Sequence, residues 1–231
     1  MEKLQDIWDK DGYKRTYWYE EFNVDKVISS NDPFIAELKK SSKKIILDAG
    51  CGIGSYPVIG AALGHKTIGI DISVESIKIA KSVANKFGIS GLIVGDVRKL
   101  PFKSNIFDIV TSGGVVEHFI ETEEALIEAY RVLKNNSNLL INVPHKMSFY
   151  VLNKLFQQAT GLWPCGYEAS FTKKKFELML KKTGFKIEDF RRMEALPGRR
   201  FPIVGKIIKI LDKMIFPFRA GGAHIYFKCK K

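Results

Sequence analysis

Three closely spaced glycines are the strongest chemical signal in the sequence. Gly50, Gly52 and Gly54 directly follow a short apolar run at 44–49. Glycine weakens helices and strands by about 0.5–1 kcal/mol relative to alanine, so this spacing indicates a backbone that turns tightly and leaves room for a ligand. Ser55 stands where a dinucleotide fingerprint needs its third glycine, and no Gly-Lys-Ser/Thr follows for a P-loop. The pattern therefore favours another nucleotide-like ligand, with a purely structural turn as the alternative.

Two aspartates extend this signal along the chain. Asp71 lies 17 residues after Gly54 at the end of a second predicted strand, and Asp96 ends a third. A carboxylate at the first position can accept hydrogen bonds from both hydroxyls of a ribose, and one at the second can reach an adenine edge. Small residues at 112–114 leave space for the rest of the ligand. Each aspartate alone could be a helix cap or a surface charge, but together with the glycines they predict an adenosine site.

The elements that position these residues alternate between short β-branched runs and helical patterns, which predicts a parallel sheet built from βαβ units. The expected strands are 44–49, 66–71, 91–96, 107–112, 138–143, 185–190 and 225–229. The expected helices are 74–87 between Ser73 and Gly88, 122–133 capped by Thr122, 172–183 capped by Thr172 and ended by Gly184, and 203–216. We expect residues 1–40 to form helices packed over the sheet edge, and 145–170 to form an aromatic-rich, partly helical insertion.

Five segments in order resemble the motifs of class I S-adenosyl-L-methionine-dependent methyltransferases: LDAGCGIGSY, GIDIS, GDVRKLPF, FDIVTSGGVVEHF and AYRVLKNNSNLLINVPH. Within that class they are most similar to the small-molecule branch that includes quinone methyltransferases. The resemblance covers residues 40–145, and ASFTKKKFELMLKKTGF more loosely. It implies a Rossmann-like, doubly wound α/β fold whose sheet has seven strands, mostly parallel with the last one antiparallel. A single methyltransferase domain would then span 1–231, with a helical cap at 1–40, a cofactor-binding core at 41–145, and the insertion, last strands and a basic helix at 146–231.

The same resemblance implies the cofactor, S-adenosyl-L-methionine, and residues that bind it. The backbone of Gly50, Cys51, Gly52 and Gly54 would line its methionine and sulfonium portion, and Asp48, which opens the motif, counts among the cofactor-binding residues. The nucleoside would be held by Asp71 at the ribose, Ile72 against the adenine, and Asp96 with the Val97 amide at the adenine edge. Ser112 or Gly113 would receive the methionine amino group.

A catalytic base is predicted less directly. The cofactor supplies the electrophile, so the protein must hold a nucleophile in line with the methyl–sulfur bond. An acidic acceptor needs no base, whereas a neutral hydroxyl or amine would benefit from one. His118, just past the fourth strand, is the best-placed candidate for catalysis, and a structural role is its alternative. Glu117 is open to the same two interpretations, and His145 is a weaker candidate.

The acceptor is the least determined part. The place where DNA and protein amine methyltransferases carry an Asn/Asp-Pro-Pro-aromatic tetrapeptide reads Ser-Gly-Gly-Val at 112–115, which weighs against those substrates. Aromatic residues in 1–30 and 145–170 are expected to roof a pocket for the acceptor. The expected acceptor is a small or lipid-like molecule with an acidic or anionic portion. An RNA methyltransferase that clamps its substrate with a basic C-terminal half is an alternative, and a non-catalytic module that binds the cofactor is another.

Composition sets the limits of these interpretations. The chain has 231 residues and a formal net charge of +12. Its content of 45% hydrophobic and 12% aromatic residues excludes a disordered protein. No run reaches the ~18 apolar residues of a membrane-spanning helix, and the N-terminus lacks the apolar core of a signal peptide, so a cytoplasmic protein is expected. Three widely separated cysteines indicate neither a metal site nor a disulfide framework.

The positive charge lies entirely in the C-terminal part. Residues 1–145 hold 18 basic and 19 acidic side chains, whereas 146–231 hold 19 basic and 6 acidic ones. The predicted helix 203–216 has an apolar face and lysines away from it. Such a helix can lie on an anionic membrane surface as a peripheral contact, or it can pack on the core with a solvated back. Nucleic acid is the less favoured partner for this charge.

Overall fold

The computed structural model describes residues 4–14, 23–193 and 222–231. Its centre is a seven-stranded sheet in the order β3-β2-β1-β4-β5-β7-β6. The strands are β1 (Ile45–Ala49), β2 (Lys66–Asp71), β3 (Gly91–Val94), β4 (Phe107–Gly113), β5 (Leu133–Pro144), β6 (Lys186–Met193) and β7 (His224–Lys230). β7 pairs antiparallel with both β5 and β6, so it alone runs against the others in this sheet. The prediction of a mostly parallel sheet with an antiparallel last strand is confirmed.

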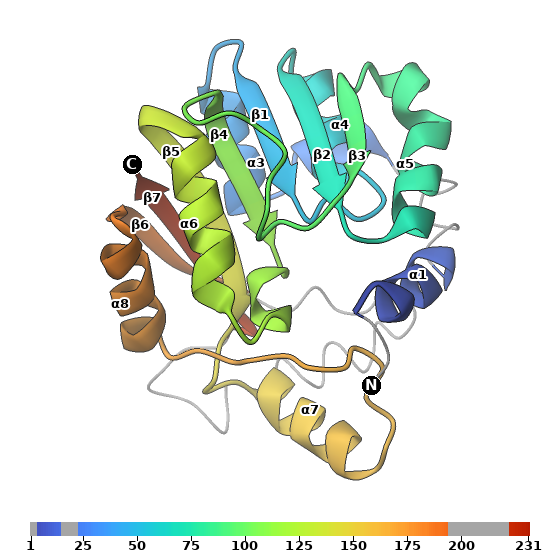
Figure 1. Ribbon diagram of the computed structural model, residues 1–231, viewed down its shortest axis with the longest axis vertical. Coiled ribbons are helices and arrows are strands. Elements are labelled where there is room, and N and C mark those ends of the chain that lie inside the picture. Colours follow the sequence, from blue (N-terminus) through green and yellow to red (C-terminus); the bar gives the residue numbers. More distant parts are fainter. Residues whose placement is uncertain (1–3, 15–22, 194–221) are drawn as a thin grey trace.

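Helices cover both faces of the sheet (Figure 1). α6 (Thr122–Val132) and α8 (Lys173–Thr183) lie in front of it, and α3 (Pro33–Lys40) and α4 (Ser55–Ala62) lie behind it. α5 (Val74–Phe87) packs along β2, β3 and α4. The remaining helical segments are α1 (Leu4–Lys14), α2 (Val24–Ile28), the short 3₁₀ turn η2 (Val116–His118) and α7 (Phe149–Ala159). In this view α1 and α7 lie beyond the ends to which the arrows of β1, β2 and β4 point.

The ends of several helices follow the predicted capping residues. The Ser73 hydroxyl accepts a hydrogen bond from the Ser76 amide at the start of α5, and Gly88 ends that helix in the left-handed region at φ +69°. Thr172 and Gly184 play the same two roles for α8. The prediction for α6 was wrong in detail, because Glu121 is the N-cap and the Thr122 hydroxyl instead donates to the carbonyl of Phe119.

One of the N-terminal helices, α3, is placed differently from the prediction. α3 packs on the sheet face rather than over its edge, with Phe34 and Leu38 fully buried against residues of β1, β4, β5 and β7. The Asp32 carboxylate caps α3 by accepting hydrogen bonds from the amides of Phe34 and Ile35. The helical spacing of apolar residues could not distinguish packing on the sheet face from packing over the sheet edge, since a helix with one apolar stripe can pack in either place.

Two further expectations concern the C-terminal part. The insertion is partly helical as predicted, with α7 inside it. The predicted helix 203–216 lies outside the described residues, so its contact with a membrane or with RNA stays a prediction. Among the described helices none combines the length and apolarity that crossing a bilayer requires.

The order of strands determines where a ligand can bind. The chain runs from β1 outward to β3 and then returns to β4, which lies directly beside β1. Connections on the two sides of this point leave in opposite directions and open a crevice at the carboxyl ends of β1 and β4, where ligands bind in such sheets. The glycine turn follows β1, and Gly113 ends β4, so both flank this crevice.

Replacement of Phe34 tests the packing of α3 on the sheet. Its ring stacks on Tyr56 at 5.0 Å and meets Tyr226 edge-on at 5.1 Å between centroids. We expect Phe34→Ala to lower the free energy of unfolding by about 3–5 kcal/mol, because it leaves a cavity, as measured by urea denaturation. Phe156→Ala is the matched control, since that ring is 64% exposed on α7. Equal effects of the two changes would contradict this packing.

Candidate cofactor and acceptor site

The glycine turn is held by the end of β2. The amides of Gly50 and Cys51 both donate to the carbonyl of Ile70, at 2.8 and 2.9 Å. Gly50 has φ +85°, and a β-carbon there would collide with the side chain of Val115. Only glycine combines this left-handed backbone with so close an approach. The turn after β1 is thereby pressed against the segment that follows β4.

Asp71 closes the turn from the other side. Its Oδ2 accepts a hydrogen bond from the Gly52 amide at 2.7 Å, and its Oδ1 accepts one from the Ser73 amide at 2.9 Å. Within the described parts of the chain, a β-carbon on Gly52 would meet no atom within 4 Å, so the turn borders open space at this point. Gly54, at φ +92°, is the N-cap of α4. The structure therefore brings Gly50, Gly52 and Asp71 together, as the sequence predicted.

Asp48 and Cys51 lie beneath the turn rather than on its open side. Asp48 is 3% exposed, and its Oδ1 accepts a hydrogen bond from the Thr111 hydroxyl at 2.6 Å. Burial, reinforced by the charge of Asp71, raises the pKa of Asp48 to about 7, although the Thr111 bond works against this. The Cys51 sulfur packs over Gly69 of β2, and burial raises the pKa of this thiol well above its usual value. Both side chains support the turn from inside.

The third strand is shorter than predicted and ends at Val94, which places Asp96 two residues beyond it. Both carboxylate oxygens of Asp96 pair with the Arg98 guanidinium, the shortest contact being 2.7 Å. Burial raises the pKa of Asp96, but the Arg98 interactions outweigh it and hold the pKa below its ordinary value. Ile72, after β2, is half-buried, and Val97 is buried. Asp96 therefore stays ionised, with Arg98 as a fixed partner.

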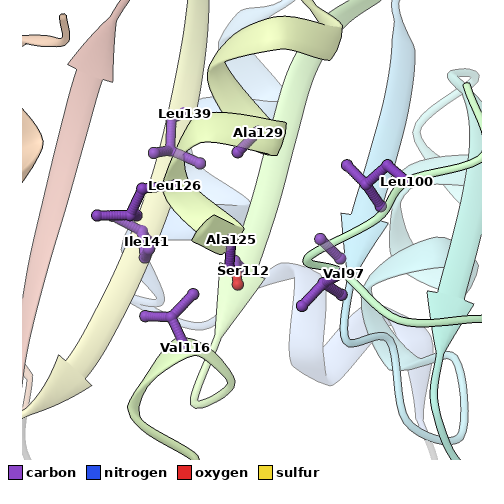
Figure 2. Close-up of a pocket in the computed structure, with 10 residues that line it drawn as sticks. Val97, Leu100, Ser112, Val116, Ala125, Leu126, Ala129, Leu139 and Ile141 are labelled. Carbon is purple, nitrogen blue, oxygen red and sulfur yellow. The ribbon is translucent and has the colours of Figure 1, made fainter. Parts of the chain in front are cut away.

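Ser112 and Gly113 end β4 on opposite sides of the sheet. Figure 2 shows the Ser112 side chain in an apolar pocket under α6, whose lining includes Val97 and Val116. Among the described residues the buried Ser112 Oγ has no hydrogen-bond partner. A β-carbon on Gly113 would lie 3.6 Å from the Tyr56 ring and 3.7 Å from the Asn142 side-chain oxygen. The pocket adjoins two predicted cofactor residues but does not include the glycine turn.

α1 covers the carboxyl ends of the strands between β2 and β4. The Asp9 carboxylate accepts hydrogen bonds from the Ser73 hydroxyl at 2.7 Å and from the Glu75 amide at 3.1 Å. One residue earlier, Trp8 meets the His118 ring edge-on at 4.7 Å between centroids. Because Ser73 follows β2 and His118 follows β4, the helix bridges the turn after β1, which lies between them. Part of the predicted aromatic roof is thus in place, whereas 15–22 lie outside the described residues.

His118 is buried, at 8% exposed, in η2 beside Glu117, which is 1% exposed. The α7 insertion brings Lys154 and Glu168 against this pair, with Lys154 Nζ 3.2 Å from Glu168 Oε1. Burial lowers the pKa of His118, so its imidazole is neutral near pH 7. His145 is also buried, at the end of β5, where its amide donates to the carbonyl of Ala223.

Several contributors were not identified from the sequence. Asp9 joins the site through α1, Arg98 pairs with a predicted residue, and Lys154 and Glu168 reach η2 from the insertion. A lysine within the apolar stretch of α7 was the available signal, because a buried lysine requires a partner. The identity of that partner depended on tertiary contacts.

Comparison with known proteins gives a consistent result. The methyltransferase domain family matches residues 47–141. The rat mitochondrial ubiquinone biosynthesis O-methyltransferase is 31% identical over 76% of this chain and 52% of its own length. The demethylmenaquinone methyltransferase of Lactiplantibacillus plantarum is 32% identical over 46% of this chain and 47% of its own length. The chain thus spans about half the length of these curated relatives.

Solved structures agree on the fold. A crystal structure of an S-adenosylmethionine-dependent methyltransferase from Thermotoga maritima superposes with a TM-score of 0.63 over 99% of both chains. Its sequence identity is 19%, so the likeness extends to the architecture and no further.

The buried carboxyl of Asp48 makes stability depend on pH. Its pKa in the folded protein is about 7 against an ordinary 3.8, so the folded state binds this proton more tightly than the unfolded state does. The stabilisation is complete below about pH 4 and is lost as the pH rises through about 7. We expect the wild type to lose on the order of a few kcal/mol more than Asp48→Asn between pH 4 and pH 8, by urea denaturation. Asp25→Asn, an exposed control on α2, should follow the wild type, and a parallel pH dependence in Asp48→Asn would refute this assignment.

Proposed function

We propose that this chain, which belongs to the class I S-adenosyl-L-methionine-dependent methyltransferases of the quinone-methyltransferase-like branch, transfers the cofactor's methyl group to a small-molecule acceptor. The observation that carries the proposal is the hydrogen bond from the Gly52 amide to Asp71, which joins the turn after β1 to the end of β2, next to the β1–β4 reversal of strand order. It sets a carboxylate beside a turn with open space, which is where an adenosine ribose binds in such folds.

The residues present suit this cofactor. The Asp71 carboxylate accepts backbone hydrogen bonds from Gly52 and Ser73, and a carboxylate has about four lone-pair sites, so it can also accept from ribose hydroxyls. The open side of Gly52 suits the sulfonium and methionine portion, which the backbone of Gly50, Cys51 and Gly54 would also line. Of the two predicted partners of the methionine amino group, Gly113 suits it, because the buried Ser112 Oγ points into the pocket under α6 on the opposite side of the sheet.

The adenine would lie between Ile72 and the 96–97 segment. Asp96 is ionised and can accept a hydrogen bond from the adenine amino group beside Arg98, with the Val97 amide next to it. Asp48 supports the glycine turn from beneath, since its carboxyl accepts the Thr111 hydrogen bond and is buried from solvent. These assignments make a continuous path from the end of β3 to the end of β4.

The bound sulfonium supplies an activated methyl group. The work of this chain is then to hold the acceptor atom in line with the methyl–sulfur bond and to exclude water, and such positioning can contribute about 7–11 kcal/mol. α1 serves the exclusion of water, because its bonds to Ser73 and its contact with His118 place it over the turn.

A flat or lipid-like acceptor is the class that we favour. Two of the relatives are named for ubiquinone and menaquinone biosynthesis, and another is named a sterol 4-C-methyltransferase. Around the acceptor side, Trp8, Tyr150 and Trp163 offer aromatic surface, with the last two rings 6.3 Å apart. Large apolar side chains such as Leu155 and Phe156 are more than half exposed on α7, which suits the approach of a greasy molecule.

Substitution of two comparable glycines tests the cofactor site. Gly52 and Gly64 both have positive φ, and a β-carbon on either would meet no atom within 4 Å. We expect Gly52→Ala to weaken S-adenosyl-L-methionine binding at least tenfold in calorimetric titration, because its methyl group enters the ligand space. Gly64→Ala carries a similar backbone strain and should bind as the wild type does. Equal affinities for the two variants, or no binding by the wild type, would overturn the proposal.

Transfer of a labelled methyl group tests the acceptor class. We expect incubation with methyl-labelled cofactor to label ring-bearing lipids and quinone precursors in a metabolite extract. Parallel reactions with purified RNA should stay unlabelled. Label in the RNA alone would favour the basic-clamp alternative instead.

A further inference from the structure

A cluster of buried polar side chains lies where η2 meets the insertion. It consists of Glu117 and His118 from η2, Tyr150 and Lys154 from α7, and Glu168, and it is called the η2–α7 cluster here. Glu117 is 1% exposed, Lys154 4%, and the Glu168 side chain 4%. The segment that carries Glu168 is fastened to η2 by a hydrogen bond from the Ala169 amide to the Glu117 carbonyl at 2.8 Å.

Three members of the cluster satisfy one another. Lys154 Nζ donates to the Glu168 carbonyl at 3.0 Å and to Ser170 Oγ at 2.7 Å, and it lies 3.2 Å from Glu168 Oε1. The Tyr150 hydroxyl donates to Glu168 Oε2 at 2.9 Å. These bonds fix α7 against the returning chain, so Tyr150, Lys154 and Glu168 have a positioning role.

His118 is likewise held in one orientation. Its Nδ1 lies 3.0 Å from the carbonyl of Tyr167, and a carbonyl can only accept, so Nδ1 carries the proton. Its Nε2 faces Glu168 Oε2 at 4.0 Å, and Trp8 packs on the edge of the ring. Protein groups therefore surround the imidazole on both nitrogen sides.

Glu168 Oε1 also makes no hydrogen bond among the described residues, but the Lys154 ammonium lies 3.2 Å from it, and Glu117 differs in this respect. Among the described residues its buried Oε2 has no hydrogen-bond partner. Its Oε1 would lie 3.6 Å from a β-carbon on Gly114, whose positive φ of +70° bends the chain between β4 and η2. Val115, two residues before Glu117, is the side chain that packs on Gly50 of the cofactor turn. A buried carboxyl oxygen without a partner, on the segment that also packs against the cofactor turn, is one that a polar ligand group or a water can satisfy.

We propose that Glu117, rather than His118, contacts a neutral hydroxyl of the acceptor and takes its proton during methyl transfer. The inference rests on the proposed function. The acceptor oxygen forms a bond to the methyl carbon while the carbon–sulfur bond breaks with its electron pair going to sulfur, and the hydroxyl proton passes to the Glu117 carboxylate. One positive and one negative charge disappear together, which a site of low polarity favours. The aromatic rings of Trp8 and Tyr150 suit an acceptor whose hydroxyl is on a ring.

The charges around Glu117 determine its protonation. Burial raises the pKa of Glu117 to about 8 and the charge of Glu168 adds to this, whereas backbone hydrogen bonding from Glu117 and Val115 and the charge of Lys154 work in the opposite direction. The Tyr150 hydroxyl also lies within reach of the charge of Glu117. A sulfonium bound beside it should lower this pKa, because an opposite charge favours the ionised form. Glu117 is then ready to act as a base once the cofactor is bound.

Infrared titration of the carboxyl band tests the assignment without requiring turnover. The difference between wild type and Glu117→Gln isolates this group, and both are made in an Asp48→Asn background because Asp48 also titrates near neutral pH. We expect a protonated-carboxyl band that disappears with a midpoint near pH 8 and is absent in Glu117→Gln. Glu168→Gln should move the midpoint down and Lys154→Met should move it up.

The cofactor and a phenol probe distinguish the roles. With S-adenosyl-L-methionine the midpoint should fall by at least about one pH unit relative to the neutral thioether product, S-adenosylhomocysteine. Phenol added to the thioether complex should shift the band in the wild type. A midpoint that is equal with both compounds, or a band that phenol does not perturb, would overturn the role of Glu117.

Binding measurements separate this inference from the proposed function. Calorimetry at pH 6, where Glu117 is protonated in the free protein, should show that Glu117→Gln binds S-adenosyl-L-methionine within about threefold of the wild type, and thermal unfolding should show that it is folded. Loss of cofactor affinity in the variant would make Glu117 a cofactor residue and overturn the inference. Failure of the wild type to bind either compound would instead overturn the proposed function.

Discussion

The hydrogen bond from the Gly52 amide to Asp71 is the constraint on which the site depends. It joins the turn after β1 to the end of β2, and the bonds from Gly50 and Cys51 to Ile70 hold the same two elements together. The turn can follow this path only because three of its residues have positive φ, which glycine adopts with little strain. The three glycines that allow this conformation have no side chains with which to pack against the core.

The site is assembled from both ends of the chain. α1 ties Ser73, two residues after Asp71, to His118, the residue after Glu117, through Asp9 and Trp8. The insertion after β5 then supplies Lys154 and Glu168 to the same region. The core of the sheet therefore fixes the cofactor side, whereas segments outside it build the acceptor side. This division explains how one sheet can serve acceptors of different chemistry.

Buried charge is distributed unevenly around the turn. Asp48 and Glu117 both have raised pKa values, of about 7 and about 8, because burial removes water from their carboxyl groups. Asp96 has a lowered pKa because Arg98 pairs with it. A cationic ligand beside the turn would stabilise the ionised form of the two raised carboxyls, so binding of the ligand and loss of their protons are coupled.

Local patterns in the sequence determined the strands, the caps Ser73, Gly88, Thr172 and Gly184, and the glycine turn with Asp71, because these depend on neighbours in the chain and on the fixed edge of a parallel sheet. The resemblance to known methyltransferases added the number of strands and the antiparallel last strand, whereas the strand order came from the structure. The sequence did not show that Asp48 would be buried against Thr111, that Arg98 would pair with Asp96, or that α3 would cover a sheet face. Nor could it bring Lys154 and Glu168 beside Glu117, since those contacts join residues that are 37 to 51 positions apart in the sequence. Only the packed tertiary structure decides which buried polar groups meet, because packing brings side chains from distant parts of the sequence together and removes the water between them.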